Sequence, residues 1–234
     1  AAMGIGSGDA VIVPAFTWVA TANVVLYCGA KPIFVDVCPK TFNIDPAKIA
    51  EKISERTKAI IPVHLFGLCA DMNAIKAVIP DHVKVLEDAA CAAGASYKGK
   101  WAGTLGDAAS FSFHPRKSIT TGEGGMITTH DGKLAEHMNQ MRNHGASISE
   151  EQRHHGPKPY ILPDFNLLGF NYRMTDLQGA IGIEQLTRLD EFINERAKWA
   201  GYYKEKLADI RWLRLPAEPE NGNHGWQSYV TYCD

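Results

Sequence analysis

The stretch Phe111-Ser-Phe-His-Pro-Arg-Lys-Ser-Ile-Thr-Thr-Gly-Glu-Gly-Gly125 places one lysine, Lys117, between an apolar strand and a glycine-rich turn. A lysine acts as a covalent nucleophile when it is held near a carbonyl group and partly shielded from water, because its neutral amine is then available. The glycines that follow allow the backbone to come close to a bound group. Taken alone, the stretch also fits a strand, a surface lysine and a hairpin turn.

A second stretch, Val83-Lys-Val-Leu-Glu-Asp-Ala-Ala-Cys-Ala-Ala-Gly94, reads as a buried strand that ends in two acids. Asp88 then lies at the carboxyl end of that strand, the edge where open α/β sheets bind ligands. An acid there, followed by a strand that delivers a lysine, fits pyridoxal 5'-phosphate (PLP): the lysine forms the Schiff base and the acid pairs with the pyridinium nitrogen. The two stretches together favour a PLP site built on Lys117 and Asp88.

Strands and helices alternate along the first half of the chain. The predicted strands span 11–13, 33–37, 57–63 and 83–86, and the predicted helices 19–27, 46–53 and 71–78. Apolar strands that alternate with helices predict a mainly parallel sheet covered on both faces, and therefore an α/β fold. Asp45, before a proline, is a candidate helix cap.

The second half continues the sheet and then changes character. Strands at 108–113 and 126–129 are expected on either side of Lys117, followed by a helix at 133–142. The polar segment 147–166 is expected to be a long surface loop. Helical spacing of apolar residues over 175–207 predicts one long helix or two abutting ones.

The ends of the chain suggest a piece of a longer protein. The opening Ala1-Ala-Met-Gly-Ile-Gly-Ser-Gly-Asp9 reads as the end of a helix and its glycine-rich stop. We expect residues 1–207 to form a large cofactor-binding domain that lacks its amino-terminal part. Residues 208–234 are expected to begin a small, truncated carboxyl-terminal domain.

Composition excludes several classes of protein. The 234 residues are 45% hydrophobic with a formal net charge of −2, which allows a substantial core and gives no reason to expect nucleic acid or an anionic membrane as partner. The five cysteines are scattered, so neither a disulfide framework nor a zinc site is indicated, and a reducing cytoplasm is the expected setting. No apolar stretch approaches the roughly 20 residues of a membrane helix.

These two stretches, with Val13-Pro-Ala-Phe-Thr-Trp-Val-Ala-Thr-Ala-Asn23 and Gly169-Phe-Asn-Tyr-Arg-Met-Thr-Asp-Leu-Gln178, resemble the DegT/DnrJ family. Its members are fold type I, PLP-dependent aminotransferases that act on keto sugars, usually nucleotide-linked. The resemblance runs nearly end to end with the motifs in the family's order. It implies the three-layer fold of the PLP-binding large domain, glutamate as the usual amino donor, and a homodimer with shared active sites.

The resemblance also implies roles for five further residues. Trp18 would stack on the pyridine ring and Ser112 would bind the cofactor phosphate, while Asn171 and Arg173 would reach the phosphate of a neighbouring subunit. Their alternatives are a core tryptophan, a serine that satisfies a backbone carbonyl, and a helix cap with a surface salt bridge. Cys91 stands where the family mostly has Gln or His contacting the cofactor, and a thiol is only a weak donor.

Four histidines stay outside the predicted catalytic set. His64 and His114 follow strands, where a histidine either contacts a ligand or satisfies the backbone. His154 and His155 lie in the predicted loop and are too few for a metal site.

The leading prediction is therefore an aminotransferase of amino-sugar biosynthesis. A dehydratase of the same family, which uses pyridoxamine phosphate and carries histidine in place of the lysine, is disfavoured by Lys117. A non-catalytic regulatory protein that binds the cofactor or a sugar is the alternative from another class. Retention of both Lys117 and Asp88 speaks against it.

Overall fold

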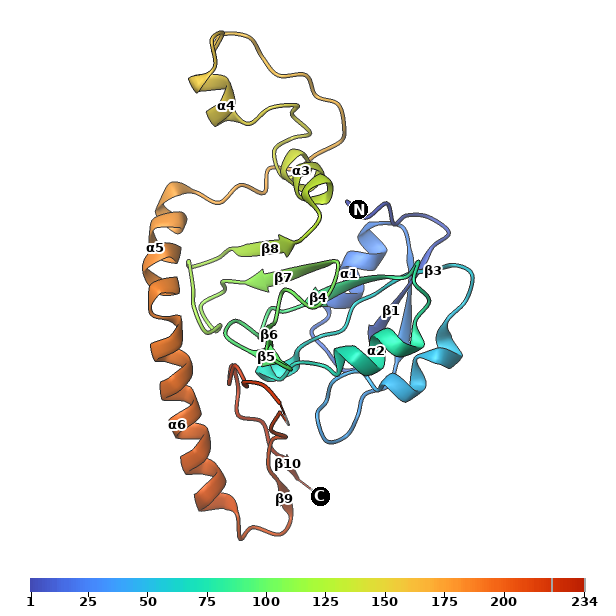
Figure 1. The fold of residues 1–234 in the computed structure, drawn as a ribbon, viewed down its shortest axis with the longest axis vertical. Helices are drawn as coiled ribbons and strands as arrows, with labels where there is room; N and C mark the ends of the chain where they lie inside the picture. Colours follow the sequence, from blue (N-terminus) through green and yellow to red (C-terminus); the bar gives the residue numbers. More distant parts are fainter. Residues whose placement is uncertain (220, 234) are drawn as a thin grey trace.

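A six-stranded sheet forms the centre of the molecule, in a computed structural model that describes residues 1–219 and 221–233 (Figure 1). In spatial order its strands are β2 (Lys31–Val35), β1 (Ala10–Pro14), β3 (Thr57–Ile60), β4 (Lys84–Asp88), β7 (Ala108–Ser112) and β8 (Gly125–Thr129). The first five strands run parallel and β8 pairs antiparallel with β7. The predicted α/β fold with a mainly parallel sheet is confirmed.

Helices and short connecting elements lie on both sides of this sheet, and α4 projects away from it (Figure 1). The α-helices are α1 (Ala20–Tyr27), α2 (Met72–Val78), α3 (Gly132–Met141), α4 (Glu150–His155), α5 (Asp176–Thr187) and α6 (Leu189–Leu207). Short 3₁₀ segments are η1 (Pro46–Lys48), η2 (Ala50–Lys52) and η3 (Leu65–Gly67). Two small two-stranded sheets pair β5 (Ser96–Tyr97) with β6 (Lys100–Trp101), and β9 (Leu213–Arg214) with β10 (Tyr232–Cys233).

Successive side chains of β1 point to opposite faces of the sheet, and each face has its own cover. Ile12 belongs to the larger buried cluster, together with Ile75 of α2. Val13 belongs to a second cluster, together with Val25 of α1. This alternation is the period of two expected of a strand, and it confirms that helices cover both faces at β1.

The segment 46–53 differs from its prediction as a single helix, because it forms the two 3₁₀ segments η1 and η2. So short a stretch gains little from continuous α-helical bonding, and its tight turns keep Ile49 fully buried. The predicted cap is confirmed, since the Asp45 Oδ1 accepts a hydrogen bond from the Ala47 amide at 3.0 Å.

The segment 147–166 is not a plain loop, because it contains α4. The helix begins at a capping box in which the Ser149 Oγ accepts from the Gln152 amide at 3.0 Å and the Gln152 Oε1 accepts from the Ser149 amide at 2.9 Å. The Ser-x-x-Gln spacing was a sequence signal for this helix start. The prediction over 175–207 is confirmed in its second form, since α5 and α6 abut at Arg188.

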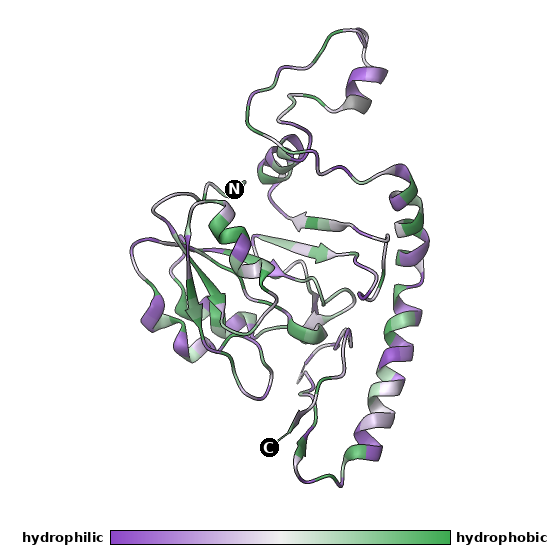
Figure 2. Ribbon diagram, turned by 180° about the vertical axis from the view of Figure 1, so that it is seen from behind, coloured by the Kyte–Doolittle hydropathy of each residue, from purple (hydrophilic) through white to green (hydrophobic). Residues whose placement is uncertain are grey.

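The large apolar side chains of α5 are exposed rather than packed into a core. Figure 2 shows apolar and polar residues alternating along α5 and α6. No residue of α5 is buried, and Ala200 is the buried residue of α6. Within the described residues, no helix has the length and apolar character that crossing a membrane requires.

The tail that follows α6 returns to the inner part of the fold, where it bonds to η3 and β5. The Gly225 amide donates to the carbonyl of Gly67 at 2.8 Å, and the Ser96 amide donates to the carbonyl of Asn223 at 2.9 Å. The expected domain boundary after residue 207 stays a prediction. Residues 220 and 234 of the expected second domain lie outside the described part of the chain.

Candidate active site

Asp88 lies at the carboxyl end of β4, as the sequence predicts. Its backbone is fixed on one side by the neighbouring segment, because the Asp88 amide donates to the carbonyl of Pro62 at 2.9 Å and its carbonyl accepts from the His64 amide at 3.0 Å. On the other side β4 pairs with β7, with Asp88 in register with Ser110. The carboxylate therefore stands on a rigid strand end, at the edge where parallel sheets bind ligands.

The side chain of Asp88 is held by Thr21, a residue that the sequence analysis missed. The Thr21 Oγ1 donates to the Asp88 Oδ2 at 2.9 Å, and the Oδ1 accepts from the Ala90 amide at 3.2 Å. Thr17 lies 3.0 Å from the hydroxyl of Thr21. Thr21 lies in the first turn of α1, and Thr17 precedes that helix. The signal was a hydroxyl in the first turn of a helix that follows a parallel strand, because that turn lies at the carboxyl edge of the sheet, where Asp88 was predicted.

Lys117 lies in the loop between β7 and β8, half-buried, with its amine turned towards the end of β4. Its Nζ donates to the Sγ of Cys91 at 3.3 Å. Cys91 belongs to the turn that directly follows Asp88, in which the Ala92 amide donates to the carbonyl of Ala89 at 2.9 Å. The structure thus brings the lysine and the acid to the same edge of the sheet through Cys91.

Three polar side chains from distant segments hold the lysine loop in place. From α5, the Gln178 Nε2 donates to the carbonyl of Glu123 at 2.8 Å, and the Gln185 Oε1 accepts from the Thr120 amide at 3.2 Å. From the tail, the Gln227 Nε2 donates to the carbonyl of Arg116 at 3.0 Å. The loop is therefore a fixed platform rather than a free surface turn.

Trp18 and Ser112 lie at the ends of elements that reach this edge. Trp18 precedes α1 and is 72% exposed, so its interpretation as a core tryptophan is wrong. Ser112 ends β7, and its Oγ accepts from the His114 amide at 3.4 Å, which leaves its own hydroxyl hydrogen free to donate. Their predicted contacts with ring and phosphate stay predictions.

Asn171 and Arg173 lie apart from these residues, on the exposed segment that enters α5. Asn171 bridges Asn143, and the Arg173 Nη1 donates to the Oδ1 of the same asparagine at 2.8 Å. Within the described residues, no recorded hydrogen bond joins either side chain to the Lys117 loop. The predicted role in a neighbouring subunit therefore remains a prediction.

His64 is not a solvent-facing ligand group, because it is fully buried against Glu87. The His64 Nε2 and the Glu87 Oε2 are 2.9 Å apart, and neither side chain is exposed to solvent. His114 lies within the lysine loop, where its Nδ1 accepts from the Arg116 amide at 3.2 Å. Among the residues described, no group of histidines, cysteines and acids has the arrangement of a metal site.

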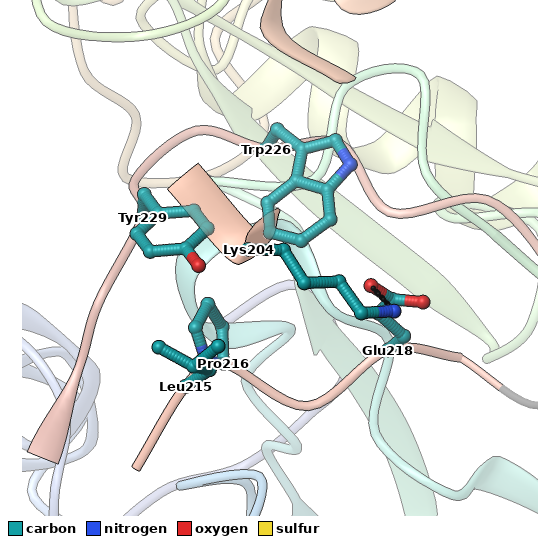
Figure 3. Close-up of a pocket in the computed structure, with 6 residues that line it drawn as sticks. All are labelled: Lys204, Leu215, Pro216, Glu218, Trp226 and Tyr229. Carbon is teal, nitrogen blue, oxygen red and sulfur yellow. Dashed lines mark hydrogen bonds and ion pairs between the residues drawn. The ribbon is translucent and has the colours of Figure 1, made fainter. Parts of the chain in front are cut away.

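A pocket of about 210 Å³ lies away from this chemistry, between α6 and the tail (Figure 3). An ion pair of 2.8 Å between Lys204 and Glu218 crosses it. Its lining residues are Lys204, Leu215, Pro216, Glu218, Trp226 and Tyr229. None of them is a predicted site residue, so we do not assign the chemistry to this pocket.

The residues at the sheet edge fit the chemical groups of PLP. An amine and a hydrogen-bonded carboxylate come from adjacent segments, as an aldehyde carbon and a ring nitrogen on one cofactor require. An exposed indole precedes α1 at the end of β1, and a serine with a free donor ends β7. The donor set therefore suits a flat, charged, phosphorylated cofactor.

Known proteins resemble most or all of the chain. It is 51% identical to the GDP-perosamine synthase of Caulobacter vibrioides over 210 aligned residues. The aligned region covers 89% of this chain and 54% of the synthase. It is 41% identical to the spore coat polysaccharide biosynthesis protein SpsC of Bacillus subtilis, over all of this chain and 60% of the relative. The chain thus spans a little over half the length of these relatives.

Solved structures agree with the fold. The PLP form of Spr1654 from Streptococcus pneumoniae superposes with a TM-score of 0.89 at 28% identity, covering 99% of this chain and 62% of that one. The family model described as the DegT/DnrJ/EryC1/StrS aminotransferase family matches residues 1–234. The chain belongs to the DegT/DnrJ/EryC1/StrS aminotransferase family.

Proposed function

We propose that the complete protein is a PLP-dependent aminotransferase that moves an amino group from an amino acid, glutamate in our prediction, to a nucleotide-linked keto sugar. The observation that carries the proposal is the hydrogen bond from Lys117 to Cys91, on the turn after Asp88. This bond holds the Lys117 amine beside the turn that follows the Asp88 carboxylate, which supports a site built on both residues. Membership of the family and similarity to a GDP-perosamine synthase support the same reaction class.

Each side chain at the sheet edge has a distinct part in this reaction. PLP, when bound, supplies an aldehyde that takes up the amino group and a ring that accepts electrons. Lys117 holds the cofactor covalently and, once released, moves the proton at the reacting carbon. Asp88 keeps the ring nitrogen protonated, and Thr21 orients the carboxylate for that task. Trp18 covers one face of the ring, and Ser112 donates to the phosphate.

Cys91 accepts a hydrogen bond from Lys117 and occupies the position where the family mostly carries Gln or His. A thiol is a weaker donor than an amide or an imidazole. We therefore propose that Cys91 packs against the cofactor ring. We expect other residues of the complete site to make the hydrogen bonds that Gln or His makes at this position in the family.

We further propose that two subunits share each active site. Asn171 and Arg173 lie on an exposed segment, where they are available to a second copy. The sequence on either side of them carries large exposed apolar side chains, which include Tyr160, Leu162, Phe165, Leu168, Tyr172 and Leu177. Exposed apolar surface on this scale marks an interaction site.

Five free cysteines are consistent with our prediction of a reducing cytoplasm.

The Lys117→Ala variant of the full-length protein tests the proposal. We expect the wild-type protein, after incubation with PLP and reduction with borohydride, to carry the cofactor covalently on the peptide that contains Lys117. The Lys117→Ala protein should carry no label and should not turn over, because it lacks the nucleophile. Lys58→Ala, which removes an exposed lysine from β3, is the matched control. Labelling of Lys117→Ala to the wild-type level, with normal turnover, would contradict the proposal.

A further inference from the structure

Glu87 is the one acid among the buried residues that the structure describes, and it is fully enclosed. Its carboxylate accepts from the amides of Gly103 at 2.8 Å, Leu105 at 2.6 Å and Gly106 at 2.6 Å. The Nε2 of His64 lies 2.9 Å from the same carboxylate. Burial alone would raise the pKa of Glu87, but the hydrogen bonds from His64, Gly103 and Gly106 outweigh it and hold the pKa below its usual value.

The geometry fixes the tautomer of His64. The Ala70 amide donates to the Nδ1 at 3.1 Å, so this nitrogen is an acceptor and carries no proton. The proton of the neutral ring is therefore on the Nε2, which donates to Glu87. Every polar atom of the pair has a partner, and the pair holds one buried negative charge.

Both residues of the pair are joined to the backbone of Asp88. Glu87 precedes Asp88 on β4, so their side chains point to opposite faces of the sheet. His64 is bound twice, because its ring contacts Glu87 while its amide donates to the carbonyl of Asp88 at 3.0 Å. A shift of the pair would therefore move the strand end on which the Asp88 carboxylate is mounted.

The same carboxylate also anchors the segment that leads into the lysine strand. The amides of Gly103, Leu105 and Gly106 converge on Glu87 just before β7, whose far end continues into the Lys117 loop. The packing there is close, since a Cβ on Gly106 would lie 2.6 Å from the carbonyl oxygen of Val85. Glu87 thus connects the strand that carries the acid with the strand that delivers the lysine.

We propose that Glu87 and His64 are positioning residues that hold the Asp88 carboxylate and the Lys117 strand in register, from the face of the sheet opposite the Asp88 side chain. The proposal rests on the proposed function, because it assigns the pair to the acid that serves PLP. A buried charge is costly, and apolar side chains of similar volume often stabilise a fold as well or better. The pair bonds to both strands that carry the proposed active-site residues, so we assign it the role of fixing how these two strands lie relative to each other.

The test compares Glu87→Gln with Asp107→Asn in the full-length protein. Asp107 is a matched control, because its Oδ2 accepts from the Val85 amide at 2.8 Å, at the opposite end of the same strand β4. A glutamine at 87 keeps the length of the side chain but presents an NH₂ group to amides that also donate, so part of the cluster loses its acceptor.

Three measurements separate positioning from stability. For Glu87→Gln we expect a single-turnover rate with glutamate about tenfold to a hundredfold lower, as for partners that orient ligating groups elsewhere. We expect weaker PLP binding and faster amide exchange in the apo protein over residues 62–66 and 86–90. Asp107→Asn should stay within about threefold of wild type in rate and PLP affinity, even where both variants lose similar thermal stability.

His64→Gln and His64→Asn keep the proposal open to refutation if Glu87→Gln does not fold. Glutamine can place a donor near the Nε2 position and so keep the bond to Glu87, whereas asparagine can keep only the acceptor for Ala70. We expect His64→Gln to retain more activity at equal stability. Equal rates in the two histidine variants, or equal losses in Glu87→Gln and Asp107→Asn, would overturn the inference. A wild-type protein that neither binds PLP nor transaminates would instead overturn the proposed function.

Discussion

Two regions of this molecule both carry apolar side chains but surround them differently. In the inner region, residues 10–112, β1 is buried along its whole length. In the outer region, residues 125–187, neither β8 nor α5 has a buried residue. Apolar side chains form a core only where other elements cover them, so the outer region has the character of an interface. The residues proposed for chemistry precede it, and those proposed to reach a neighbouring subunit lie within it.

The largest effect is expected where the inner region carries the chemistry, at Asp88. Asp88→Asn keeps the shape of the side chain but cannot keep the ring nitrogen protonated, so the reaction loses its electron sink. We expect a single-turnover rate with glutamate lower by roughly a hundredfold or more, with near-normal thermal stability. Thermal unfolding measured beside the rate checks this. A stable variant with an unchanged rate would remove Asp88 from the mechanism and weaken the contrast between the regions.

A charged substitution in the outer region should weaken association of the subunits and leave the stability of the fold nearly unchanged. Leu177 is 80% exposed on α5, so Leu177→Glu costs little in an isolated chain but places a charge in an interface. We expect the full-length variant to shift from dimer to monomer in sedimentation or light scattering. Lys58→Glu, which adds the same carboxylate to the inner region, is the control and should remain dimeric. A dimeric Leu177→Glu protein would indicate that other segments of the complete chain cover α5.

A smaller effect is expected in the tail, where the buried His224 lies between Asn223 and Gly225, the residues that bond to the inner region. Burial lowers the pKa of His224 to about 4, although the charge of Glu218 acts in the opposite direction. The histidine of the unfolded chain binds a proton near pH 6.5, whereas in the folded chain it stays neutral down to about pH 4. The free energy of unfolding therefore falls as the pH drops from about 6.5 to about 4, by about 3 kcal/mol at most.

The His224→Asn variant isolates this contribution. Asparagine keeps an acceptor for the Trp226 amide, which donates to the His224 Nδ1 at 2.9 Å, but it does not titrate. Denaturant unfolding of the full-length protein at several pH values should therefore show a shallower loss for the variant between pH 6.5 and 4. Parallel curves for the two proteins would mean that the tail is not held against the inner region in the complete protein.

The sequence by itself determined the strand and helix alternation and the order of the motifs. Apolar runs of strand length mark β4 and β7, and the residues that end them follow directly, so Asp88 and Lys117 were predicted at one edge of the sheet. The capping box of α4 was also readable at Ser149, although it was not used. These features depend on neighbours within a few residues, which is why a linear pattern contains them.

Only the tertiary structure decided which polar groups support these residues. Thr21 reaches Asp88 across 67 positions of sequence, and Gln227 reaches the lysine loop across 111. His64 and Glu87 were visible as a histidine after a strand and an acid beside another, but nothing in the sequence paired them. Each of these contacts joins a single polar side chain to a segment far away in the sequence, and no hydrophobic repeat or local motif links the two. Their partners are therefore fixed by the packing of the sheet, and not by local sequence.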